Sequence, residues 1–158
     1  MSTTDKSEGQ SHEDTLLTLV RTLAHDLDAK VAFICERLDS DPEVARTVAL
    51  FVDDQFLENF EYKIAGTPCE AVYREGSLSI ASGTSGLYPD DEMLAELNIE
   101  SYVGYALYDA GGQVLGHLGI LDEKPLSDEA SARRRLRELA TQAVEELNQR
   151  RAATKTER

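Results

Sequence analysis

The sequence lacks tryptophan altogether and has only two cysteines and four prolines among its 158 residues. Because Cys35 and Cys69 are far apart and each lies in a regularly patterned segment, neither a disulfide framework nor a metal site is indicated, and we expect reduced thiols. No apolar run approaches the roughly 18 residues that cross a bilayer, and the acidic start does not resemble a secretory signal. The sequence therefore predicts a cytoplasmic protein with no membrane partner.

Basic residues are also scarce. Lysine and arginine number 16 against 30 aspartates and glutamates, which gives a formal net charge of −14 at pH 7. This charge opposes binding to phosphate backbones and anionic lipids, so we expect no nucleic acid partner. An acidic surface keeps a protein dissolved whatever it binds, and the charge therefore does not identify a ligand.

Hydrophobic residues make up 41% of the chain, which is enough for one core and too little for two ordinary domains. Residues 1–12 are polar with no apolar period, and we expect a disordered leader there. The single domain is expected over 13–150, and a polar tail over 151–158.

Apolar spacing and turn residues predict the order of the elements. Helices are expected at 14–27, 68–74, 89–98 and 127–149, with Ser127 as the cap of the last one. Strands are expected at 30–37, 44–56, 77–81, 102–108 and 113–121, and a flexible loop at 82–86. Gly111 and Gly112 accept the positive φ of a tight hairpin turn. This order predicts an α+β fold with a central antiparallel sheet and helices on both faces.

The start of the second helix has the clearest local signal. The Thr67 hydroxyl is placed to accept from the amide of Cys69 or Glu70, Glu70 can reach back to the Thr67 amide, and Pro68 takes the first helical position. The pattern predicts a capping box, and Gly76 is expected to end this helix.

The same segment carries a family resemblance. The run from Tyr62 to Glu70, Tyr-Lys-Ile-Ala-Gly-Thr-Pro-Cys-Glu, resembles the Tyr-x-x-x-Gly-Thr-Pro-Cys-Glu signature of bacterial GAF sensor domains, and the segments 96–104 and 112–122 resemble the same subgroup. The likeness spans about residues 14–150. One departure is Ala106, where family members usually have proline.

The resemblance implies a sheet of about six strands, a ligand cavity between the sheet and the segments on one face, and the first and last helices packed together on the other. In the family those two helices often build a parallel homodimer. Such domains commonly precede an output module, and none follows the last helix here, so we expect either a domain that acts alone on a partner or a piece of a longer protein.

The chemistry of the best-known GAF groups is not matched. The cysteine, histidine and Asp-Ile-Pro-like segment that attach a bilin are missing, the pattern of the cyclic-nucleotide group cannot be assembled, and Cys35 and Cys69 do not fit the motifs of free methionine sulfoxide reductases. We therefore expect no enzyme activity. No metal site is expected either, because no histidine pair has ligand spacing; the isolated His117 is interpreted as a packing or hydrogen-bonding residue rather than a ligand.

Cys69 has two interpretations. Near a helix start, unpaired amides and the helix dipole lower the pKa of a thiol, which would make Cys69 a redox sensor. The neighbouring Glu70 opposes a thiolate, and a cysteine in a short amphipathic helix is more commonly a small buried apolar residue.

Tyrosines gather around the segments that would cover the cavity. Tyrosine combines an apolar ring with a polar tip, which suits a small organic ligand. The candidate pocket residues are Tyr62, Cys69, Tyr88 and Tyr102. The simpler alternative is that these rings fill the core of a chain without tryptophan.

Two functions follow from these observations. The first is a sensor that binds a small organic molecule; the second is a dimerisation module without a ligand. Small residues on the last helix, Ala132, Ala140 and Ala143, permit close helix packing and favour a homodimer through the first and last helices. No cofactor is indicated.

Overall fold

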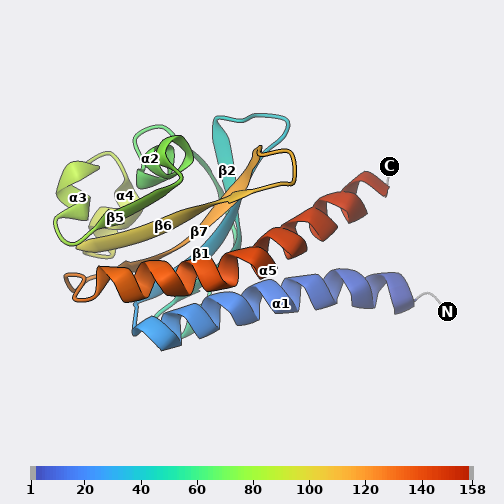
Figure 1. Ribbon diagram of the computed structural model, residues 1–158, viewed down its shortest axis with the longest axis horizontal. Helices are drawn as coiled ribbons and strands as arrows, with labels where there is room; N and C mark the ends of the chain where they lie inside the picture. Colours follow the sequence, from blue (N-terminus) through green and yellow to red (C-terminus); the bar gives the residue numbers. More distant parts are fainter. Residues whose placement is uncertain (1–2, 157–158) are drawn as a thin grey trace.

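The computed structural model describes the backbone of residues 3–156 and the side chains of residues 14–152. One antiparallel sheet separates two layers of helices (Figure 1). The helices are α1 (Thr3–Leu27), α2 (Pro68–Glu75), α3 (Thr84–Leu87), α4 (Glu92–Glu96) and α5 (Glu129–Thr156). The strands are β1 (Val31–Arg37), β2 (Val44–Val52), β3 (Gln55–Phe56), β4 (Glu61–Lys63), β5 (Ser77–Ile80), β6 (Ser101–Tyr108) and β7 (Val114–Asp122).

The strands follow the order β3-β2-β1-β7-β6-β5, and β4 also pairs with β2. All pairings within residues 3–156 are antiparallel, so the predicted α+β architecture is confirmed. The predicted hairpin joins β6 and β7, and Gly112 in its turn has φ +82°. The first strand of the chain lies in the middle of the sheet, so β2 and β7 pair with its two edges, and its side chains are buried in an apolar cluster on each face.

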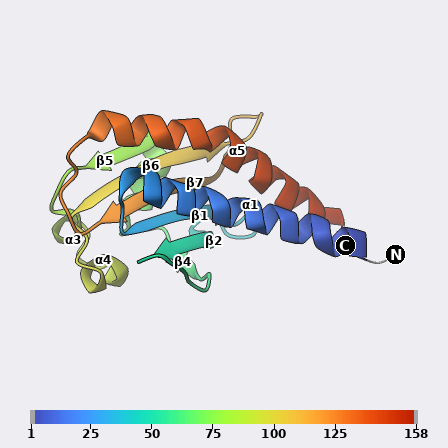
Figure 2. The ribbon, with the colours of Figure 1, turned by 90° about the horizontal axis from the view of Figure 1, so that it is seen from below.

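The helices α1 and α5 lie side by side across one face, with the described chain ends at the same end of the molecule (Figures 1 and 2). Their apolar stripes form one buried cluster with alternate residues of the strands, because a helical period of 3.6 and a strand period of two each place one apolar row on this face. Leu16 and Val20 of α1 and Leu136 and Ala143 of α5 are fully buried. The predicted packing of the first and last helices is confirmed.

Both ends of the chain differ from the prediction. The helix α1 begins at Thr3, so the backbone of 3–12 is helical where a disordered leader was expected, and Met1 and Ser2 lie outside the described residues. The helix α5 continues through the expected polar tail to Thr156. Once a helix has nucleated on a packed stripe, each added residue gains one hydrogen bond, so polar residues can extend it. None of the described helices is long and apolar enough to cross a membrane.

Local turn chemistry accounts for the other corrections. The predicted strand 44–56 is interrupted after Val52, because Asp53 and Asp54 adopt positive φ and turn the chain into β3. The second half of the predicted loop 82–86 belongs to α3, whose first residue, Thr84, is buried and donates a hydrogen bond from its hydroxyl to the Glu100 carbonyl at 2.7 Å. At the start of α5, Asp128 rather than Ser127 accepts from the Ser131 amide, at 2.9 Å.

The predicted capping box before α2 is wrong. The Thr67 hydroxyl donates to the Ile64 carbonyl at 2.7 Å, and Thr67 makes no side-chain hydrogen bond to the helix amides. The helix nevertheless begins at Pro68, as predicted, and Gly76 ends it with φ +91°. A carbonyl exposed by the preceding turn is a suitable acceptor for the hydroxyl, which therefore serves the turn instead of the helix.

Two glycines shape the sheet face opposite α1 and α5. Gly104 of β6 and Gly119 of β7 are cross-strand partners, and Gly119 is also the partner of Phe33 on β1. A Cβ at Gly119 would lie 2.6 Å from the Val103 carbonyl oxygen and 2.7 Å from the Phe33 ring. A Cβ at Gly104 would lie 2.6 Å from the hydroxyl oxygen of Tyr102. Two bare positions therefore make room for two aromatic side chains.

We predict that Gly119→Ala lowers the free energy of unfolding by about 2–3 kcal/mol, because one of the overlapping atoms belongs to the backbone and cannot rotate away. Urea unfolding measures the change. Gly86→Ala is the matched control, since a Cβ added there would meet no atom within 4 Å, and it should change stability by less than about 0.5 kcal/mol. Equal stability of the two variants would contradict the crowding at Gly119.

Candidate functional site

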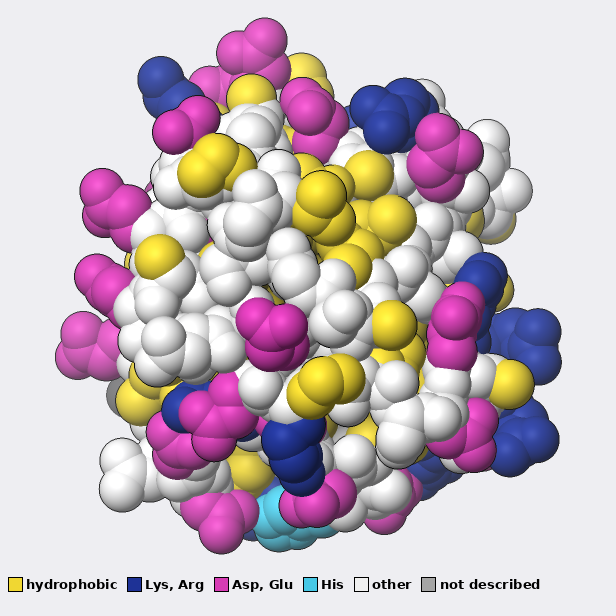
Figure 3. Space-filling view, turned by 90° about the vertical axis from the view of Figure 1, so that its left-hand side faces the viewer, with side chains coloured by type: hydrophobic (Ala, Val, Ile, Leu, Met, Phe, Trp, Pro, Cys, Tyr) yellow, Lys and Arg dark blue, Asp and Glu magenta, His cyan; other side chains and the backbone are white. Residues whose placement is uncertain are grey.

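A cavity of about 490 Å³ lies between the sheet, the segment from β4 to the start of α2, and α4. This volume falls within the roughly 300–1,000 Å³ of small-molecule sites. Its wall includes apolar side chains from three strands and α4, namely Phe33, Leu50, Leu121, Met93 and Leu94. Figure 3 shows the face of the molecule that carries α3 and α4, where apolar side chains gather near the centre with acidic side chains around them.

Two aromatic pairs form part of the wall. The rings of Phe33 and Tyr102 are 6.3 Å apart between centroids, and those of Phe60 and Tyr62 are 5.9 Å apart. Tyr102 is 2% exposed, and its hydroxyl has no hydrogen-bond partner at normal geometry among the described residues. The hydroxyl of Tyr102 lies near the Cys69 thiol and acts to lower the pKa of that thiol. Because sulfur is a weak acceptor, this contact leaves the hydroxyl largely unsatisfied.

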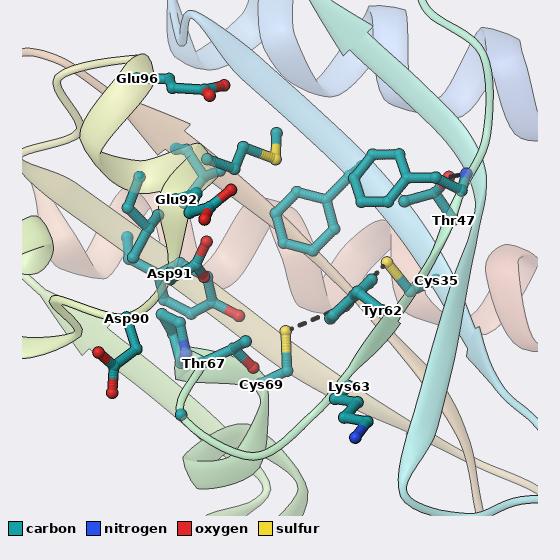
Figure 4. Close-up of a pocket in the computed structure, with 18 of the residues that line it drawn as sticks. Cys35, Thr47, Tyr62, Lys63, Thr67, Cys69, Asp90, Asp91, Glu92 and Glu96 are labelled. Carbon is teal, nitrogen blue, oxygen red and sulfur yellow. Dashed lines mark hydrogen bonds between the residues drawn. The ribbon is translucent and has the colours of Figure 1, made fainter.

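Beside the rings, a chain of polar contacts joins four elements, β1, β4, α2 and β7. The Tyr62 hydroxyl lies 3.4 Å from the Cys35 sulfur and 3.2 Å from the Cys69 sulfur (Figure 4). The Cys69 sulfur lies 3.0 Å from Nε2 of His117, and Nδ1 of His117 lies 2.6 Å from the Tyr73 hydroxyl. Cys35 and His117 meet because they are cross-strand partners on β1 and β7.

Burial controls the ionisation of this chain. It raises the pKa of both thiols, with Cys35 raised further by the neighbouring Cys69. Burial also lowers the pKa of His117 to about 3, so the ring is neutral at pH 7. The expectation that a helix start lowers the pKa of Cys69 is wrong, because desolvation outweighs the hydrogen bonds that favour the thiolate.

Carboxylates line the opposite side of the cavity. Figure 4 shows Asp91 and Glu92 with their carboxylates near one another, across the cavity from Tyr62 and Cys69, whereas Asp90 points away. Burial raises the pKa of Asp91, although the amides of Leu94 and Met93 act in the other direction. Lys63 also lines the cavity, and its ammonium group points away from the centre.

The structure brings together most of the residues selected from the sequence. Tyr62, Cys69 and Tyr102 line the cavity. Tyr88 is not among the lining residues; it packs, partly buried, against the apolar cluster on the same face of the sheet. Within the described residues, no group of three histidine, cysteine or acidic side chains is arranged to hold a metal ion, and His117 makes hydrogen bonds instead.

The sequence reasoning did not select Cys35, Phe33 or Phe60 for the pocket, and Tyr73, one of the tyrosines expected around the cavity, was not among the candidate residues. For Phe33 and Cys35 the available signal was the alternation of side chains along β1. The two residues are two positions apart, so both point to the face of the sheet that carries the cavity. No spacing rule links Tyr73 to His117, which is 44 residues later in the chain.

No family model and no curated protein matches the sequence. Solved structures do match the fold. The GAF domain of an Acinetobacter phosphoenolpyruvate-protein phosphotransferase has a TM-score of 0.66 and 17% identity, with 96% of this chain and 92% of that chain covered. A free methionine-R-sulfoxide reductase from Neisseria meningitidis, solved with its substrate, has a TM-score of 0.64 and 16% identity, with 90% and 81% covered.

A third similar structure is the chromophore-binding domain of a bacteriophytochrome from R. palustris, with a TM-score of 0.69, 8% identity and 94% of this chain covered. The chain spans only 60% of that domain. These likenesses show a GAF-like fold, as the sequence resemblance implied. Known GAF folds thus include both binding domains and an enzyme, so the fold alone does not decide between them.

We predict that both thiols of the folded protein react with a maleimide at least about tenfold more slowly than free cysteine at pH 7, because burial disfavours the thiolate. The variant Cys35→Ala reports Cys69 alone, and Cys69→Ala reports Cys35. In urea both should react at the rate of free cysteine. A folded-state rate for Cys69 above that of free cysteine would support the redox-sensor interpretation instead.

We predict that His117 makes stability fall with acidity. In the unfolded chain histidine binds a proton below about pH 6.5, whereas folded His117 stays neutral down to about pH 3, so stability is lost as pH falls through that window. From pH 7 to pH 5 the loss from this group is about 2 kcal/mol. Urea unfolding of the wild type and His117→Gln at both pH values measures it. The same pH dependence in both proteins would contradict a neutral buried His117.

Proposed function

We propose that this chain is a sensory GAF domain that binds a small organic molecule in the cavity beside Tyr62, Cys69 and Tyr102, and that it acts as a binding module rather than an enzyme. The observation that carries the proposal is the cavity itself, whose aromatic wall includes a buried tyrosine hydroxyl with no satisfactory partner. Buried polar groups are normally hydrogen-bonded, so such a hydroxyl is suited to a ligand atom.

The position of the sequence signature supports the proposal. The segment that resembles the bacterial sensor subgroup forms β4, the turn after it and the first turn of α2, and its Tyr62 and Cys69 contribute directly to the wall. The ionisation of the thiols argues against enzyme chemistry at Cys69, since burial favours the protonated form, which is a poor nucleophile.

The sheet offers a route for a signal from the cavity to the helices. Along β1, Phe33 and Cys35 line the cavity, while Ala32 and Ile34 belong to the cluster with α1 and α5. A ligand that moves Phe33 therefore acts on a strand whose other face contacts those helices. The proposed output is therefore the α1 and α5 surface, where a partner or a second copy of the chain would bind.

The second candidate is the dimerisation module without a ligand. It is favoured by the two long helices, which lie together on one side of the sheet and extend beyond it at the end where Thr3 and Thr156 lie (Figures 1 and 2). The same preparation of protein tests both candidates.

We predict that native mass spectrometry of the purified protein detects a bound small molecule that is released on denaturation, and that Met93→Trp removes it by filling the cavity from α4. Leu87→Trp is the matched control, because Leu87 is 63% exposed on α3 and does not line the cavity. The chain has no tryptophan of its own, so the fluorescence maximum of each variant checks whether the new side chain is buried.

A bound molecule in the wild type and Leu87→Trp but not in Met93→Trp supports the sensor. An empty dimer in all three proteins supports the dimerisation module. Retention of the molecule by Met93→Trp would contradict the proposed location of the site.

A further inference from the structure

We propose that the cavity selects an organic cation, a protonated or alkylated amine with an apolar body small enough for about 490 Å³. The proposal rests on the proposed function, because it names the chemical class of the ligand for the same site. Three features of the wall carry it: the sign of the charge that faces the cavity, the aromatic rings opposite that charge, and the unsatisfied hydroxyl between them.

The charged side chains of the wall are mostly acidic. Four carboxylates line the cavity among the described residues, against one lysine: Asp90, Asp91, Glu92 and Glu96. Asp91 and Glu92 lie across the cavity from Tyr62 and Cys69, and the lysine points away from it (Figure 4). An anionic ligand would meet repulsion there, and a neutral one would leave the half-buried Asp91 without a counter-charge.

Capping explains only part of the placement of Asp91. It precedes α4 as the N-cap residue, but it makes no side-chain hydrogen bond to the helix amides that meets normal geometry. Burial raises the pKa of Asp91 more than the amides of Leu94 and Met93 lower it. The described residues alone therefore do not fully compensate the charge of the ionised carboxylate. A cation in the cavity would supply that compensation.

The rings across the cavity suit the same ligand. Phe33, Phe60, Tyr62 and Tyr102 all line it, and an ammonium group is attracted to the face of an aromatic ring, more strongly where water is excluded. The Tyr102 oxygen can accept a hydrogen bond from an N–H group, which would satisfy a hydroxyl whose nearest partner among the described residues, the Cys69 sulfur, is a weak acceptor. The apolar wall from Leu50, Leu94 and Leu121 would hold the body of the ligand.

The test compares three probes of nearly one shape that differ in charge: 2-phenylethylammonium, 2-phenylethanol and phenylacetate. Isothermal titration calorimetry with the full chain at pH 7 should show that the ammonium binds at least about tenfold more tightly than the alcohol, and phenylacetate most weakly. The preference for the ammonium over the alcohol should shrink as salt is added, because part of it is electrostatic.

Two variants test the acidic side of the wall. Asp91→Asn keeps a residue that can cap α4, and Glu92→Gln changes charge with little change in shape. Each should weaken binding of the ammonium probe about three- to tenfold and leave binding of 2-phenylethanol within about twofold. Glu70→Gln is the control, because Glu70 is exposed on α2 and does not line this cavity. It removes one negative charge from the same region and should leave binding of all three probes unchanged.

Equal or tighter binding of the alcohol or phenylacetate would overturn the proposal while leaving the sensor function intact. Loss of ammonium affinity in Glu70→Gln equal to that in Asp91→Asn would also overturn it, since net charge alone would then explain the preference. If none of the three probes binds, the proposal fails, and the mass measurement on Met93→Trp and Leu87→Trp still decides the sensor function separately.

Discussion

The cavity depends on the absence of two side chains from the sheet. Gly104 and Gly119 face each other across β6 and β7, and the space above them is occupied by the Tyr102 hydroxyl and the Phe33 ring. With any larger residue at Gly119, the ring would be driven away from the strand or the strand would have to move. The aromatic wall, and with it the placement of the Tyr102 hydroxyl beside Cys69, follows from this close approach of rings to backbone.

The polar groups of the wall have few good partners. The chain of contacts from Cys35 to Tyr73 is made of thiols, phenol hydroxyls and a neutral imidazole that hydrogen-bond to one another. Burial disfavours the charged form of each of these groups. Such a chain is a weak source of stability, because thiols are poor donors and acceptors. What it provides is a set of fixed, uncharged dipoles at one end of the cavity, while the carboxylates of Asp91 and Glu92 supply charge at the other.

Sequence patterns predicted the fold better than the details of the site. The strands 30–37, 102–108 and 113–121 and the glycine turn at Gly112 were predicted within a few residues, because burial selects those patterns directly, whereas the outer ends of α1 and α5, which are polar, were not. Cap predictions failed at Thr67, where one hydroxyl has two possible partners, and at Ser127, where the neighbouring Asp128 serves the helix amide instead. Tyr62, Cys69 and Tyr102 were found, but the contact of Cys69 with His117 depends on how β7 pairs with β1, which no local pattern encodes.

The same alternation that makes β1 a central strand also limits how a ligand can act. Phe33 faces the cavity and Ile34 faces α1 and α5, and β1 pairs with a neighbour on each side over most of its length. A strand held in this way resists sliding, because a shift of one residue would exchange its two faces. Under the proposed function, a ligand would therefore act through small tilts of the strand rather than through sliding, and α1, which packs against β1, would be the first helix to meet such a tilt. The pairing of β1 with β2 is irregular between Ile34 and Cys35, directly beside the cavity, and a bulge bends its strand locally, so this is the position on β1 where the proposed function would place the bend.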